Sequence, residues 1–165
     1  MRSKLAKAVR STFTKCLTSE LPQFRLATGF PVPSGCRLYE WRLDQTITCY
    51  LMLEVPSRMF NDRFTVEGIV TEGDFPPLTA PLSMKPLLEK RRWFSFRIPF
   101  LWLTGSHSDR WWEICPGMDL SNPFAPEEPI EVGLQRVAPQ VDDAIEKIKQ
   151  YVVPFFESFR DKGKL

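Results

Sequence analysis

The residue types with the greatest chemical potential gather between Arg91 and Trp112, in the run RRWFSFRIPFLWLTGSHSDRWW. This run holds four of the five tryptophans and the only histidine of the chain. Wide aromatic faces beside fixed positive charges make stacking and cation–π contacts, and such residues are frequent where proteins bind partners. The core of a sheet uses the same aromatic residues. The run therefore predicts either a contact surface or a part of the core.

Serine, histidine and aspartate are also the residue types of a catalytic triad, and they are adjacent in the segment Ser106–Asp109, around His107. Triads are assembled from distant segments, because neighbours in a loop do not face one another with the geometry of a nucleophile and its base. We therefore interpret Thr104–Asp109 as an exposed polar loop. No catalytic residue is assigned.

The four cysteines, Cys16, Cys36, Cys49 and Cys115, are far apart in the sequence. They form no CxxC pair and no Cys/His group, so the sequence predicts no zinc site. Isolated cysteines in apolar stretches indicate reduced thiols in a cytoplasmic protein. A pair that joins Cys36 or Cys49 to His107 would make a cysteine-dependent enzyme, and this remains the lowest-ranked alternative.

Other catalytic patterns are absent from the sequence. The eight glycines never form a GxGxxG or phosphate-binding loop, so nucleotide hydrolysis is not expected. The pairs Glu127/Glu128 and Asp142/Asp143 are sequence neighbours, and neighbours on a helix point in different directions. We interpret them as solvated residues and not as an acid–base pair. The sequence thus predicts a non-catalytic protein without metal or cofactor.

Apolar periodicity predicts the helices that frame this chain. Leu5, Val9, Phe13 and Leu17 mark one face of a helix over about residues 3–20. The same residues read as the first helix of the domain, although a basic, acid-free N-terminus is also typical of a mitochondrial presequence.

The last third predicts a second, longer helix, with apolar residues every three or four positions from Val137 to Phe159. Asp142 and Asp143 are expected in its first turn, where carboxylates suit the helix dipole. Pro154 is expected to kink this helix or split it.

The middle of the chain predicts strands, at Arg37–Leu43, Thr46–Val55, Arg63–Thr71, Arg92–Phe96 and Trp111–Cys115. The first two form a hairpin that turns at Asp44-Gln45, and Gly68 is a candidate β-bulge. The order of helix, antiparallel strands and helix predicts one α+β domain over residues 1–165. Its antiparallel sheet of about five strands carries the N-terminal helix and the long kinked C-terminal helix on one face, which leaves the other face open.

Strand alternation divides the aromatic run. Arg92, Phe94 and Phe96 share one face of a strand, opposite Trp93 and Arg97. The apolar face is expected in the core and the other face in contact with a partner. The predicted partner-binding residues are Arg92, Trp93, Arg97, Trp102, His107, Arg110, Trp111 and Trp112.

Charge is unevenly distributed, although the net charge is only +2. Residues 1–15 hold five basic residues and no acid, and residues 127–157 hold seven acids against three basic residues. Stacking of bases on Trp93 or Trp102 would make a single-stranded nucleic-acid-binding protein, which is the second-ranked hypothesis. The near-neutral total and the acidic last third favour a protein partner.

The order of features resembles the bacterial 4304-type domain of unknown function. It comprises the opening amphipathic helix, the turn Gly29-Phe30, the strand DRWWEI (109–114) and a closing helix with the element YVVPFFESF (151–159). The resemblance implies no established activity or catalytic residues. By analogy with small cytoplasmic domains of this sort, it suggests an immunity or antitoxin-type inhibitor of a bacterial toxin. Our leading hypothesis is therefore a cytoplasmic protein-binding module with no role at a membrane.

Overall fold

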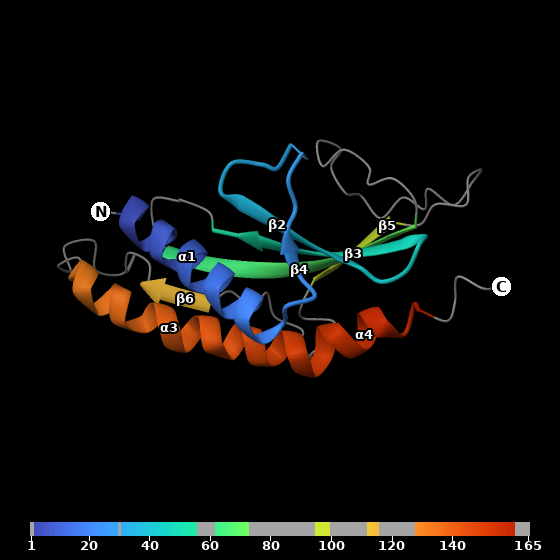
Figure 1. Cartoon of the computed structure of the whole chain (residues 1–165). Coiled ribbons are helices and arrows are strands. Elements are labelled where there is room, and N and C mark those ends of the chain that lie inside the picture. Colours follow the sequence, from blue (N-terminus) through green and yellow to red (C-terminus); the bar gives the residue numbers. More distant parts are fainter. Residues whose placement is uncertain are drawn as a thin grey trace.

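Figure 1 shows the computed structural model of the chain, which describes residues 2–29, 31–55, 62–72, 95–99, 112–115 and 128–160. Its elements, in order, are α1 (Arg2–Glu20), β1 (Arg25–Leu26), β2 (Cys36–Arg42), β3 (Ile47–Glu54), β4 (Asp62–Glu72), β5 (Ser95–Pro99), β6 (Trp112–Cys115), α3 (Ile130–Lys147), a π-helical turn (Ile148–Val152) and α4 (Val153–Glu157).

The strands of the described residues form one antiparallel sheet in the order β1-β2-β3-β4-β5. The short strand β6 pairs with the first residues of β4. The predicted α+β fold is confirmed, and so is the predicted hairpin, which is β2 and β3. The fourth predicted strand is represented by β5, and its predicted residues 92–94 lie outside the described residues.

The helices cover one face of this sheet, as predicted (Figure 1). Along α1, the residues Leu5, Val9, Phe13 and Leu17 are at most 3% exposed, and they pack against the sheet and α3 in the main core. The apolar face of α1 therefore belongs to the domain core, as expected of its first helix. From α3 onward, the core receives the buried side chains Val137, Val141, Ala144, Ile145, Ile148, Val152 and Phe156.

Gly68 is not a bulge. It is paired in register with Leu51 on β3 and with Ile98 on β5, and the register of β4 shifts instead between Asp62 and Arg63. A Cβ atom on Gly68 would lie 3.2 Å from Phe156. The glycine is therefore a place where α4 approaches the sheet closely, which local sequence does not distinguish from a bulge.

The C-terminal helix begins earlier than predicted. α3 starts at Ile130, so Asp142 and Asp143 lie in its last turns and not in its first. Pro139 lies inside this helix and is exposed. A proline removes one backbone hydrogen bond, and on an exposed face water can hydrate the carbonyl that loses its partner. The helix can therefore continue through Pro139.

Pro154 perturbs the helix without ending it. The turn Ile148–Val152 before it is π-helical, and the N–H of Val153 donates to the carbonyl of Ile148. A proline has no N–H to donate, and its ring crowds the carbonyl four residues earlier. The wider π turn before Pro154 accommodates the ring and the missing hydrogen bond. The predicted split is therefore a change of helical register between α3 and α4.

The prediction of an open second sheet face is wrong where the structure describes that face. Leu38, Tyr50, Met52 and Ile69 form a second apolar cluster, and each is at most 4% exposed. Ala27 and Val32, from the chain between β1 and β2, pack against it, and so does Cys36, the first residue of β2. The strand pattern could not show this cover, because the segment that supplies it is an irregular, proline-containing connector.

Candidate functional site

Most of the predicted contact surface lies outside the described residues. This holds for Arg92, Trp93, Trp102, His107, Arg110 and Trp111. Arg97 lies in β5, directly opposite Ile69 of β4, and the preceding Phe96 lies opposite Val70. Ile69 belongs to the second cluster and Val70 to the main core. The contact predicted for Arg97 stays a prediction, because the side chains of β5 lie outside the described part of the structure.

Trp112 is described, and it belongs to the core. It is 4% exposed and stacks on Phe64, with ring centroids 5.2 Å apart and an interplanar angle of 12°. Its indole N–H donates to Oδ2 of Asp143 at 2.8 Å, and Nζ of Lys147 lies 5.9 Å from its ring centroid. The prediction that Trp112 contacts a partner is therefore corrected. In β6 the ring faces inward between β4 and α3, because the strand alternates Trp112 in, Glu113 out and Ile114 in.

Two of the three described thiols, those of Cys16 and Cys49, have raised pKa values. Burial, reinforced by the charge of Asp44, raises the pKa of Cys49 to about 12. Burial, and then the nearby carboxylates of Asp142 and Glu20, raise the pKa of Cys16. Cys36 is partly buried and is in no disulfide bond. The thiolate is the reactive form of cysteine, and a raised pKa lowers the thiolate fraction at neutral pH. The raised pKa values therefore indicate structural roles for Cys16 and Cys49 and not nucleophilic ones.

Two absences hold for the part of the chain that the structure describes. No three His, Cys, Asp or Glu side chains there gather as a metal ion would require. No helix within those residues is long and apolar enough to cross a membrane.

The outer surface of the helix layer is the candidate site, and α1 contributes a basic stripe to it. We define this basic stripe as Lys4, Lys7 and Lys15, which are all exposed. They recur at helical spacing opposite the buried face of α1, over about 16 Å of helix. None of the three forms an ion pair with a carboxylate among the described residues. Their charge is directed to solvent.

The helix α3 contributes an acidic stripe, defined here as Glu131, Asp142 and Glu146, which are also exposed. Two further acids, one just before this helix and one within it, form ion pairs inside the fold. Glu128 pairs with Arg136 through two hydrogen bonds of 2.6 and 2.7 Å, and Asp143 pairs with Lys147. Glu131 and Asp142 form no ion pair within the described residues.

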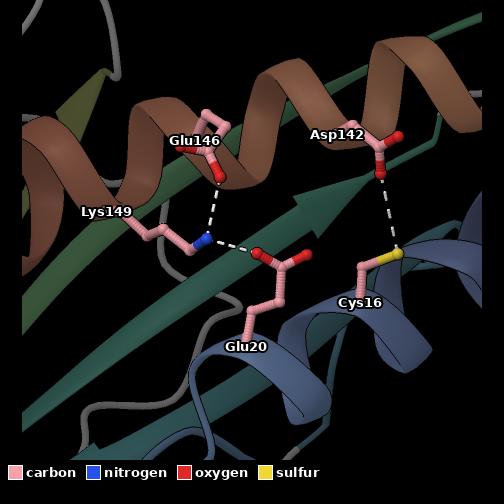
Figure 2. A network of polar contacts seen from close by, with 5 residues as sticks. All are labelled: Cys16, Glu20, Asp142, Glu146 and Lys149. Carbon is pink, nitrogen blue, oxygen red and sulfur yellow. Dashed lines mark hydrogen bonds and ion pairs between the residues drawn. The ribbon is translucent and has the colours of Figure 1, made fainter.

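A polar seam joins the two stripes near the C-terminal end of α1 (Figure 2). Nζ of Lys149 bridges Glu20 of α1 and Glu146 of α3, the latter at 2.8 Å. The thiol of Cys16 donates to Oδ1 of Asp142 at 3.9 Å, a long and weak contact. These contacts advance in the same direction along both helices, which therefore run parallel, as Figure 1 also shows.

An exposed leucine lies next to the acidic stripe. Leu134 of α3 is 42% exposed, and Leu26 is the other large apolar side chain that is exposed among the described residues. Leu134 precedes the buried Val141 by seven residues, which is about two turns, and Asp142 by eight, so it lies at the edge of the buried face of α3, next to the acidic stripe. The site thus has a basic side, an acidic side and an exposed apolar side chain.

A signal for this site is present in the sequence, in its uneven distribution of charge. The basic first helix and the acidic last third were both recognised from composition. Their position side by side depends on the packing of elements more than a hundred residues apart, as in the contact of Cys16 with Asp142. The predicted divergence of Asp142 and Asp143 is confirmed, since Asp142 contacts Cys16 and Asp143 contacts Trp112.

Comparison of this chain with family models, with curated proteins and with solved structures finds no match.

Proposed function

We propose that this protein is a non-catalytic protein-binding module and that the helix-layer surface is its contact surface. The observation that carries the proposal is the pair of stripes of opposite charge, with Leu134 exposed beside the acidic one. Exposed charges steer and orient a partner, and an exposed apolar side chain supplies an anchor that is desolvated on binding.

The two signs of charge favour a protein partner over a nucleic acid. A nucleic acid is uniformly negative and would be attracted by Lys4 and Lys7 but repelled by Glu131 and Asp142 beside them. A protein surface can complement both stripes at once. The exposed side of α1 also offers lysines and hydroxyl groups, without an aromatic residue on which a base could stack.

Within this class, the proposal includes an immunity or antitoxin-type inhibitor that acts in the cytoplasm. The resemblance to the bacterial 4304-type domain supports this narrower proposal by analogy alone. Cys16, Cys36 and Cys49 are in no disulfide bond, which suits a reducing compartment. The predicted aromatic and basic residues around β5 remain a second candidate contact surface.

The experiment is affinity capture from the native cell with the wild-type chain and two matched charge-reversal variants. Lys4→Glu/Lys7→Glu changes the basic stripe near the N-terminus of α1, where carboxylates suit the helix dipole. Arg25→Glu/Arg42→Glu reverses two exposed charges on β1 and β2. We expect a specific protein that is retained by the second variant and lost by the first. Loss with both variants or with neither, while both remain folded, contradicts the proposed surface.

Nucleic acid is distinguished in the same experiment. Capture that disappears after nuclease treatment, and whose affinity for single-stranded oligonucleotides falls steeply with salt, would favour the alternative function.

A further inference from the structure

The two stripes are complementary to each other as well as to a foreign partner. α1 and α3 lie beside each other and run in the same direction (Figure 1), so the basic stripe of one helix and the acidic stripe of the other extend along the same helix layer. Consider a two-fold axis that lies above this surface, midway between the two stripes and parallel to the helices. Rotation by 180° about this axis places a second copy face to face with the first. It places the basic stripe of each copy on the acidic stripe of the other. Closed two-fold dimers of this kind are the commonest assemblies of soluble proteins.

The levels of the charges along the helices agree with this arrangement. The contact of Cys16 with Asp142 fixes the alignment of α1 with α3. Lys15 lies one residue before Cys16, hence level with Asp142. Lys4 lies twelve residues before Cys16 and Glu131 eleven residues before Asp142, which are rises of about 18 and 16 Å. A two-fold axis along the helices preserves these levels, so both basic positions would meet an acid of the second copy.

The position of Leu134 is an independent observation for the same symmetry. It lies at the edge of the buried face of α3, next to the acidic stripe, and it is 42% exposed. Residues near a two-fold axis meet their own counterparts, so the leucines of two copies would cover each other. A dimer would bury an apolar side chain that is otherwise in contact with water.

We infer that the partner of the helix-layer surface is a second copy of this chain, which docks about a two-fold axis parallel to α1 and α3. The inference rests on the proposed function, since it names the occupant of that contact surface. The pairs Lys4–Glu131 and Lys15–Asp142 each form twice between the copies, around the two leucines.

The test is a charge swap between two variants. Lys4→Glu/Lys7→Glu/Lys15→Glu makes both stripes of a chain acidic, and Glu131→Lys/Asp142→Lys makes both predominantly basic. Each variant alone should be monomeric, because like charges face each other and lower the association constant by more than about tenfold. An equimolar mixture should form a one-to-one dimer, since both pairs of stripes are again complementary. Masses are measured by analytical ultracentrifugation, and folding is verified by circular dichroism.

The wild-type chain should be dimeric at low salt and dissociate as salt rises, and Leu134→Ala should weaken the dimer. A monomeric wild type together with a mixture that does not associate overturns the inference. If the basic stripe is nonetheless required to capture a different protein, the proposed function survives and only the second copy is excluded. A wild-type dimer that the charge variants leave intact also overturns the inference, because the contact then lies elsewhere.

Discussion

The ring of Phe156 lies directly against the backbone of Gly68, where a Cβ atom would be only 3.2 Å from Cζ of the ring. Phe156 is fully buried, and it contacts Phe24 and Trp41 with centroid distances of 6.3 and 6.4 Å. Gly68 therefore sets how closely α4 approaches the sheet.

Gly68→Ala should lower the free energy of unfolding by about 1–3 kcal/mol, because the added methyl group overpacks this contact. Urea denaturation provides the measurement. Adding Phe156→Leu should give a double variant that loses less than the sum of the single changes, since the smaller side chain leaves room. Unchanged stability of Gly68→Ala would show that the helix shifts at no cost.

Trp112→Ala should lower the free energy of unfolding by about 3–5 kcal/mol, since it removes a buried ring and its hydrogen bond to Asp143. Leu26→Ala is the matched control, because Leu26 is 46% exposed and its loss should change stability by no more than about 0.5 kcal/mol. Equal effects of the two changes on the free energy of unfolding would show that Trp112 is not part of the core. Thermal or urea unfolding distinguishes these outcomes.

The hydroxyl of Thr14 connects α1 with β2. It donates to the carbonyl of Arg10 at 2.7 Å and accepts from the buried hydroxyl of Tyr39 at 2.7 Å and from Arg37 at 3.1 Å. Thr14→Val should cost about 1–3 kcal/mol, because the Tyr39 hydroxyl loses its acceptor. In a double-mutant cycle with Tyr39→Phe, the double variant should lose less than the sum. Strict additivity would mean that the two hydroxyls do not interact.

Asp44 closes the turn between β2 and β3. Burial acts to raise its pKa, but hydrogen bonds from the backbone of Thr46 and Ile47 and from the Thr46 hydroxyl outweigh burial and lower the pKa below its usual value of 3.8. A lowered pKa in the folded state stabilises the fold above the unfolded-state pKa, and this stabilisation is lost as the pH falls through the folded-state pKa.

Wild type should therefore exceed Asp44→Asn by about 0.5–1 kcal/mol at neutral pH, since Asn retains an acceptor but not the charge. The difference should vanish as the pH falls below 3.8. Urea midpoints at several pH values measure it. A difference that is constant with pH would exclude the charge as its cause.

Cys49 should resist alkylation in the native protein at neutral pH, because its pKa of about 12 leaves almost no thiolate and its side chain is buried. Iodoacetamide labelling followed by peptide mass analysis measures the rate at each cysteine, and the urea-unfolded chain serves as the control. Rapid native labelling of Cys49 would instead support the cysteine-dependent alternative.

The sequence by itself predicted the elements whose apolar residues repeat at a regular spacing. α1 was predicted from the spacing of Leu5 to Leu17, and β2, β3 and β4 from strand composition, because burial on one face repeats with the period of the element. The fold class followed from the order of these elements. The same reasoning missed the start of α3, because Pro139 interrupts the local pattern that marks a helix.

Only the tertiary structure decided which face of each element is covered and what lies beside it. The residue type of Trp112 does not reveal whether it is buried, and it is the pairing of β6 with β4 under α3 that places it in the core. The stripes of α1 and α3 form one surface because these two helices pack against each other, although they lie more than a hundred residues apart in the sequence. Such contacts depend on non-local packing, which neither composition nor periodicity records.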